Sequence, residues 1–142
     1  MSYSLAFSQA IAIVVFVSSK VEACMYDFVP TKELSEALNI TRPTAVKILQ
    51  RLTNVGIIET REGAKGGVRL AKSPDEVTLL DVFNAIEQQR PLFRIDMGIH
   101  IAGEKPARVK QNLLEVLTHT ENTMKQGLQG TSIAELYRED LA

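Results

Sequence analysis

The 142-residue sequence is poor in several residue types, and each shortage narrows the possibilities. It contains one cysteine, no tryptophan, eight glycines and five prolines. A single thiol, Cys24, cannot form an internal disulfide, which is typical of a protein kept in a reducing compartment. So few glycines and prolines exclude disordered and fibrous chains. We expect one globular domain, or a small domain with an added dimerisation element.

Long hydrophobic segments are missing as well. Residues 10–17 (AIAIVVFV) are apolar, but this run is far shorter than the ~20 residues that a membrane-spanning helix needs. A lipoprotein-like Val-Glu-Ala-Cys follows, yet no Lys or Arg precedes the run, and Lys20 and Glu22 separate it from Cys24. We interpret residues 4–24 as a helix with one broad apolar side, and we expect a cytoplasmic protein without membrane contacts.

A large charge excess is also absent, because the formal net charge is −1. The distribution of charge is nevertheless uneven. Residues 42–72 contain seven Lys or Arg and two Asp or Glu, a balance of +5, whereas the other residues balance to −6. A basic module in an acidic frame fits a polyanionic partner, and a solvated charged surface is the alternative.

Two short helices joined by a tight turn are expected at the start of this module. Thr31 is a good N-cap for a helix over residues 32–38, and Asn39 tolerates the left-handed conformation of a tight turn. Thr41 then caps a second helix, which Gly56 ends. This pattern is typical of a helix-turn-helix, and a helical hairpin with a hydrated face is the alternative.

The second helix, residues 42–55, would be the recognition helix. Pro43 lies in its first turn, where a missing N–H does no harm. We expect its outward side to carry one basic stripe, because such side chains reach phosphates and base edges in the major groove of DNA. The residues of this stripe are Arg42, Thr44, Lys47 and Arg51.

A two-stranded wing is predicted directly after this helix. Residues 57–61 and 68–71 have the pattern of short strands, and the glycine-rich segment 62–67 joins them around Lys65. Lys65 would lie near DNA phosphates, and the glycines would let the backbone approach closely. A nucleotide-binding phosphate loop is the rival interpretation, but no Gly-Lys-Ser/Thr sequence follows and the loop joins strand to strand.

Three more helices are expected in the rest of the chain. Thr78 caps a helix over residues 79–89, and a long helix runs from Pro106 to about residue 126. Its single apolar side is typical of pairing with a second subunit, and a short helix over 132–138 follows it.

These elements predict a mainly α fold with a small two-stranded β wing. We divide the chain into three parts. Residues 1–88 form a winged helix-turn-helix DNA-binding domain, residues 89–105 a linker loop, and residues 106–142 the dimerisation helix with the short C-terminal helix.

Several motifs in fixed order resemble a known family. They are TKELSEALNI at 31–40, VKILQRL at 46–52, GAKGG at 63–67, LAK at 70–72, VTLLDV at 77–82 and AIE at 85–87. Together they resemble the Rrf-type-two family of winged helix-turn-helix transcription regulators, the group of IscR, NsrR and CymR. The resemblance is strong over residues 30–87 and mainly architectural elsewhere.

What the resemblance implies is a homodimer on double-stranded operator DNA, with the recognition helix in the major groove and the wing along the minor groove. Glu62 and Val68 depart from the residues common at these wing positions, and Arg61 would compensate for Glu62. The DNA-binding residues implied by position, together with the basic stripe, are Thr41, Arg42, Pro43, Thr44, Lys47, Arg51, Arg61, Lys65, Gly66 and Gly67.

Cluster ligands are the largest departure from the family pattern. Many relatives carry three cysteines before the long helix, and soft thiolates of this kind retain an iron–sulfur cluster. Residues 90–105 contain no cysteine, and Asp96 and His100 would be poor substitutes. We therefore expect a cluster-free member with no iron–sulfur cluster, no other cofactor and no metal site.

The signal that such a protein senses is left open. An unknown small-molecule effector would bind between the winged domain and the long helix, near Phe83, Leu92 and Phe93, unless these side chains belong to the core. Cys24 is either a redox sensor or an inert packed residue.

The predicted function is a sequence-specific DNA-binding transcription regulator that acts as a repressor. The alternative is a protein-interaction module on a winged-helix scaffold with lost or weak DNA affinity. An enzyme is not expected, because no carboxylate pair, metal-ligand cluster or nucleophile–base set occurs at a recognisable spacing. His100 and His119 have no evident catalytic partner.

Overall fold

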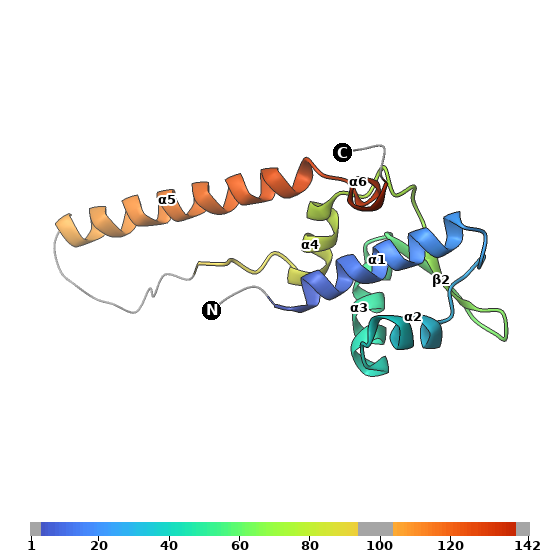
Figure 1. Ribbon diagram of the computed structural model, residues 1–142. Coiled ribbons are helices and arrows are strands. Elements are labelled where there is room, and N and C mark those ends of the chain that lie inside the picture. The colour runs from blue at the N-terminus through green and yellow to red at the C-terminus, as the bar shows by residue number, and fades with distance from the viewer. Residues whose placement is uncertain (1–3, 94–103, 139–142) are drawn as a thin grey trace.

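The computed structural model describes residues 4–93 and 104–138 of the chain. Over these residues the fold is mostly helical, with one two-stranded antiparallel sheet (Figure 1). In order, the elements are α1 (Ala6–Glu22), α2 (Thr31–Leu38), α3 (Arg42–Asn54), β1 (Ile58–Arg61), β2 (Gly67–Leu70), α4 (Leu79–Glu87), α5 (Glu104–Gln129) and α6 (Ile133–Tyr137). The predicted fold class, with a β wing after the third helix, is confirmed.

A single hydrophobic core joins α1, α2, α3, α4, α6 and the wing, which together we call the body. Leu34 of α2, Leu52 of α3 and Ile86 of α4 are completely buried in it.

Among the described helices, none has the length and apolarity to cross a membrane. α1 supplies four buried apolar residues at the spacing of one helical side, namely Ala10, Ile13, Val14 and Val17.

The helix ends test the expected caps. Thr78 caps α4 as predicted, because its side chain accepts a hydrogen bond from the N–H of Asp81 while the Asp81 carboxylate accepts one from the N–H of Thr78. Asn39 is left-handed after α2, with φ of 52°, as the tight turn requires. The expected cap of α2 is wrong, since Pro30 occupies the cap position and Thr31 is the first helical residue.

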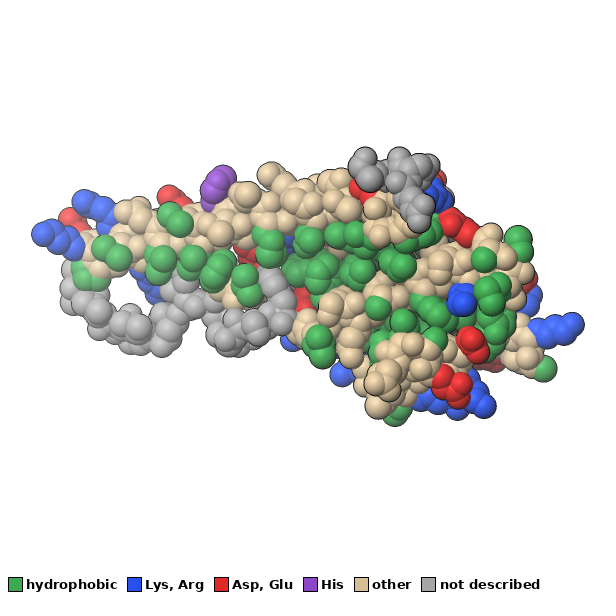
Figure 2. Space-filling model, in the orientation of Figure 1, with side chains coloured by type: hydrophobic (Ala, Val, Ile, Leu, Met, Phe, Trp, Pro, Cys, Tyr) green, Lys and Arg blue, Asp and Glu red, His purple; other side chains and the backbone are tan. Residues whose placement is uncertain are grey.

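α5 extends away from the body (Figure 1). It begins at Glu104, before the predicted start, so that Pro106 lies in the first turn, where no helical hydrogen bond needs its N–H. None of its 26 residues is buried. Figure 2 shows hydrophobic side chains in a row along this helix, and the large exposed ones are Val109, Leu113, Leu114 and Val116.

α6 returns from the end of α5 to the body. Ile133 and Ala134 are fully buried, and the N–H of Ile133 donates to the carbonyl oxygen of Val77 (2.8 Å). The sequence-based division kept residues 106–142 together as one part. That division stays a prediction. In the structure, α6 packs against α1 and against the segment that leads into α4.

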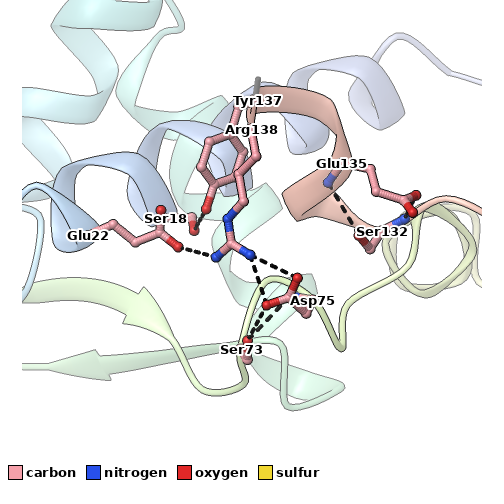
Figure 3. A network of polar contacts seen from close by, with 8 residues as sticks. All are labelled: Ser18, Glu22, Ser73, Asp75, Ser132, Glu135, Tyr137 and Arg138. Atoms are coloured by element: carbon pink, nitrogen blue, oxygen red, sulfur yellow. Dashed lines mark hydrogen bonds and ion pairs between the residues drawn. The ribbon is translucent and has the colours of Figure 1, made fainter. Parts of the chain in front are cut away.

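Arg138, directly after α6, links three segments of the body (Figure 3). Its Nη2 donates to Glu22 of α1 (2.7 Å), and its Nη1 donates to Asp75 in the turn before α4 (2.9 Å). The hydrogen bonds to Glu22 and then Asp75 raise the pKa of Arg138. The hydroxyls of Tyr137 and Ser18 lie 2.7 Å apart beside it. We call these five residues the C-terminal latch.

Candidate nucleic-acid interface

The outward side of α3 is defined by the residues that the helix buries. Its core side consists of Ala45, Ile48, Leu49 and Leu52. With 3.6 residues per turn, the centre line of the opposite side passes through four other residues. All four are exposed, and we call them the outward ridge: Pro43, Lys47, Gln50 and Asn54.

The predicted basic stripe coincides only in part with this ridge. Lys47 lies on the ridge, whereas Arg42 is the first residue of α3 and lies outside the ridge. Both side chains are exposed with no hydrogen bond to another described residue. Thr44 is half-buried, and its Oγ1 accepts a hydrogen bond from the hydroxyl of Thr41 (2.9 Å). Thr41 occupies the N-cap position of α3 as expected, but its side chain makes no hydrogen bond to the backbone of the helix.

Arg51 points to a different part of the molecule. Its Nη1 donates to the carbonyl oxygen of Ile86 near the end of α4 (2.8 Å), so the structure does not bring it together with Arg42 and Lys47. Sequence reasoning missed Gln50 and Asn54, whose amides are the groups that pair with base edges. Gln50 and Asn54 could have been found from the sequence, because the spacing of the apolar residues of α3 fixes which residues lie on the opposite, exposed side of the helix.

The wing glycines have a structural cause that the sequence did not reveal. A Cβ at Gly66 would lie 2.2 Å from the carbonyl oxygen of Arg61, and a Cβ at Gly67 would lie 2.2 Å from that of Val29. Val29, in the segment between α1 and α2, exchanges two hydrogen bonds with Val68 of β2 (2.8 and 2.9 Å). Gly66 therefore lets the wing tip fold back on the backbone of Arg61, and Gly67 lets β2 approach the segment between α1 and α2.

Charge on the interface depends on which cations are already paired. Asp27 contacts both Arg61 (3.5 Å) and Arg69 (2.9 Å), and Glu59 pairs with Arg69 across the sheet. The hydrogen bond to Glu59, with the charge of Asp27, raises the pKa of Arg69. Four cations of residues 42–72 are exposed and have no partner among the described residues: Arg42, Lys47, Lys65 and Lys72.

A groove separates α3 from the wing strands. Its polar groups are amides and hydroxyls, and no charged side chain lines it. The outward ridge, this groove and the wing tip with Lys65 thus offer uncharged hydrogen-bonding groups flanked by free cations, a combination that suits a polyanion whose edges carry donors and acceptors. The groove is lined by Thr31, Val46, Leu49, Gln50, Thr53, Asn54, Thr60 and Val68.

The residues predicted for an effector site have different surroundings. Phe83 is 3% exposed and packs edge-to-face on Phe7 of α1, with ring centroids 5.3 Å apart, so it belongs to the core. The N–H of Leu92 donates to Glu121 of α5 (2.9 Å), while Phe93 is partly exposed after α4. The effector site stays a prediction.

Cys24 is exposed just after α1, with φ of 58°, so it is not a packed residue. Among the residues that the structure describes, no group of three His, Cys, Asp or Glu side chains could hold a metal ion. Asp96 and His100 lie outside the described ranges. One cysteine in the whole sequence does not fit the thiolate set that an iron–sulfur cluster requires.

Comparison with known proteins identifies relatives of this chain. The model of the Rrf2 family, described as an iron-dependent transcriptional regulator, matches residues 3–139. Over 55 residues, 39% of this chain, the sequence is 42% identical to Protein aau3 of Rhizobium meliloti. The match spans only 36% of the length of that relative.

Solved structures with the same fold include two regulators. One is CymR, the global cysteine regulator of B. subtilis, with a TM-score of 0.68, 17% identity, and coverage of 96% of this chain and 95% of CymR. The other is IscR of T. potens, with a TM-score of 0.63, 13% identity, and coverage of 96% and 85%. The family and these neighbours are transcriptional regulators and not enzymes. With a family model that covers nearly its whole length, the chain belongs to the Rrf2 family of transcriptional regulators.

Proposed function

We propose that this protein is a sequence-specific DNA-binding repressor that acts as a homodimer through α3 and the glycine-rich wing. The observation that carries the proposal is one surface on which unpaired cations lie beside amide side chains. Lys47 is exposed on the same side of α3 as Gln50 and Asn54, Arg42 is exposed at the start of this helix, and Lys65 is exposed at the wing tip. Cations bind phosphates whatever the sequence, whereas amides distinguish base edges.

In this proposal α3 enters the major groove with its outward ridge. Lys47 and Gln50 reach base edges, while Thr41, Arg42, Pro43 and Thr44 approach at the start of the helix, the end that commonly contacts bases in this motif. The wing tip, with Lys65, lies along the neighbouring minor groove. Arg51 and Arg61 are occupied by contacts within the protein, so we assign them no direct role at DNA.

A second copy of the chain is proposed to cover the apolar side of α5. A row of large exposed hydrophobic side chains on a helix without a buried residue is the pattern that helix pairing removes from water. Two-fold symmetry would then present two α3 helices to half-sites about one DNA turn apart, roughly 34–36 Å.

We further propose that this member regulates without an iron–sulfur cluster. Its lone cysteine supplies one thiolate, and an iron–sulfur cluster is held by several. Protein purified without oxygen is expected to lack the visible absorption of such a cluster and to bind DNA equally well after treatment with an iron chelator. Absorption with stoichiometric iron and sulfide would contradict this.

The test of the proposed function is selection followed by titration. Duplexes are enriched from a random pool on the wild-type protein, and fluorescence anisotropy then compares the selected duplex with the unselected pool at several salt concentrations. We expect a clear preference for the selected duplex and a steep salt dependence, about −0.9 in log K per log salt for each neutralised phosphate.

Variants separate the two kinds of contact. Lys47→Ala should change the sequence preference, and Lys65→Ala should weaken binding to both duplexes and reduce the salt slope by about 1. Lys125→Ala on α5 is the charge-matched control and should change neither. Failure to enrich any duplex, with weak and equal binding throughout, would favour a protein-interaction module on the same fold.

A further inference from the structure

Two arginines of the wing lie on the face turned away from α3. Side chains alternate between the two faces of a strand, and residues paired across an antiparallel sheet share a face. Thr60 and its partner Val68 line the groove against α3. Arg61 and Arg69 are the neighbours of these residues in sequence, so they belong to the opposite face, together with Glu59.

The segment between α1 and α2 supplies the partners of both arginines. The Asp27 carboxylate contacts Nη1 of Arg61 with one oxygen and Nη1 of Arg69 with the other. The guanidinium carbons of the same arginines lie 4.2 and 4.4 Å from the centre of the Phe28 ring, within the range of cation–π attraction. Asp27 and Phe28 thus hold the pair by charge and by ring contact at once.

One of these arginines also reaches the wing tip. Nη2 of Arg61 donates to the carbonyl oxygen of Lys65 (3.0 Å). Inside the tip, the N–H of Gly66 donates to the carbonyl oxygen of Gly63 (3.0 Å). A continuous chain of contacts therefore runs from Asp27, through Arg61, to the loop that presents the Lys65 ammonium group.

We propose that Asp27 and Phe28 are positioning residues of the wing: by holding Arg61 and Arg69 on the face opposite α3, they fix the tip in the conformation that meets DNA. In this arrangement Arg61 is a structural link and not a phosphate ligand, although the sequence counts it among the wing cations. The inference rests on the proposed DNA binding only for its consequence. The positioning itself is a property of the free protein.

The experiment compares Asp27→Asn and Phe28→Leu with Lys65→Ala and wild type, in the full-length protein. Glu76→Gln is the control, because Glu76 is an exposed acid with no side-chain partner among the described residues. Amide hydrogen exchange of Gly66 in the free protein reports the order of the tip. Anisotropy with the selected duplex and with the random pool reports affinity and salt slope.

For Asp27→Asn and Phe28→Leu we expect faster exchange of the Gly66 amide than in wild type and unchanged exchange in α1. Affinity for the selected duplex should fall about two- to fivefold, the range of one exposed ion pair, with the salt slope unchanged because no phosphate contact is lost. Lys65→Ala should give the reverse pattern, a smaller slope with normal exchange. Thermal melting verifies the fold, and Asp27→Asn carries the test alone if Phe28→Leu does not fold.

Two results would overturn the proposal. Unchanged exchange of the Gly66 amide in both variants would mean that the α1–α2 segment does not hold the tip. Tighter binding by Asp27→Asn to both duplexes with a steeper salt slope would mean that Arg61 is a phosphate ligand which Asp27 restrains. If wild type prefers no duplex, the proposed function fails, whereas the exchange measurement still decides the positioning role.

Discussion

The body and α5 both carry apolar side chains on one side of their helices, but the body buries these side chains and α5 leaves them exposed. In the body, helices of five to seventeen residues each bury apolar side chains against a neighbour, as Leu52 and Ile133 illustrate by their complete burial. α5 is the longest helix described, and none of its 26 residues is buried. The body is complete within one chain, whereas α5 has an apolar side that only another surface can cover.

The comparison indicates where folding and assembly are encoded. Most of the stability of a helix in a protein comes from packing of its apolar side and not from intrinsic propensity. The body satisfies that requirement internally, so we expect it to fold without help. In the proposed homodimer a second copy would supply the missing contacts of α5, so the stability of this helix should depend on protein concentration.

The largest expected effect is a direct contrast between Leu52→Ala in α3 and Leu113→Ala on α5. Leu52 is 0% exposed, so its truncation should lower the free energy of unfolding by ~2–5 kcal/mol at any protein concentration. Leu113 is 48% exposed in one chain, so its truncation should cost less in dilute protein and more as concentration rises. Urea unfolding at two concentrations measures both, and equal, concentration-independent losses would remove the distinction.

A second substitution on α5 tests subunit assembly separately from folding. Leu113→Glu places a charge on the apolar side of α5 and should dissociate the proposed homodimer while the body stays folded. Affinity for the selected duplex should then fall about a hundredfold, because the second half-site contact is no longer linked to the first. Light scattering and anisotropy measure the two changes.

Asn122→Glu is the control for that substitution, since Asn122 is exposed on the opposite side of α5. It should leave both the molecular mass and the DNA affinity as in wild type. Dissociation by both variants would indicate a general effect of charge on the helix, and a monomeric wild type would contradict the homodimer.

A smaller effect is expected from loss of the Arg138 ion pairs that hold the end of α6 on the body. Arg138→Gln removes both ion pairs of the C-terminal latch and leaves Glu22 and Asp75 without their shared cation. The melting temperature should fall by less than for Leu52→Ala, and the difference from wild type should shrink in high salt, which screens exposed charges. Arg108 on α5 is an exposed arginine, and Arg108→Gln should show no such difference.

The smallest expected effect is a pH dependence at the latch. Burial raises the pKa of Tyr137, with the carboxylate of Glu22 adding to the shift. The folded protein therefore retains the phenol proton of Tyr137 to higher pH than the unfolded chain, in which tyrosine has a pKa of about 10. Stability from this residue is full below that pH and is lost as pH rises through the folded pKa.

Tyr137→Phe isolates this contribution. The difference in melting temperature between wild type and the variant should be constant at neutral pH and should narrow above about pH 10. The loss of the Ser18 hydrogen bond adds only a constant offset. Parallel curves across the alkaline range would contradict the assignment.

Local signals explain why the elements of this fold were predictable. Thr78 and Asp81 lie three residues apart and satisfy each other's backbone at the start of α4. The buried side of α3 follows from its own 3.6-residue period, and the wing from a glycine-rich segment between two short strands. Each of these features depends on residues that are neighbours in sequence.

The partners of the cations were not predictable in the same way. The sequence places Arg51 and Arg61 among the predicted DNA contacts, and it does not show that the fold brings the carbonyl oxygen of Ile86 to Arg51 and Asp27 to Arg61. A guanidinium group has the same sequence signature whether it faces solvent, a carbonyl or a carboxylate. The return of α6 to the core was hidden for the same reason, because its site beside Val77 is made by distant segments.

That return gives α5 the mechanics of a lever. At its C-terminal end α5 leads into α6, next to the segment before α4. It also contacts α4, and its Glu121 accepts a hydrogen bond from the N–H of Leu92, while its N-terminal end lies far from these attachments (Figure 1). At 1.5 Å per residue α5 is roughly 40 Å long, so a tilt of about 5° at the attachment moves the far end by ~3 Å. The α4 helix beside this pivot also holds Arg51 of α3. In the proposed homodimer, a small rotation between the two α5 helices would therefore displace the two α3 helices relative to each other.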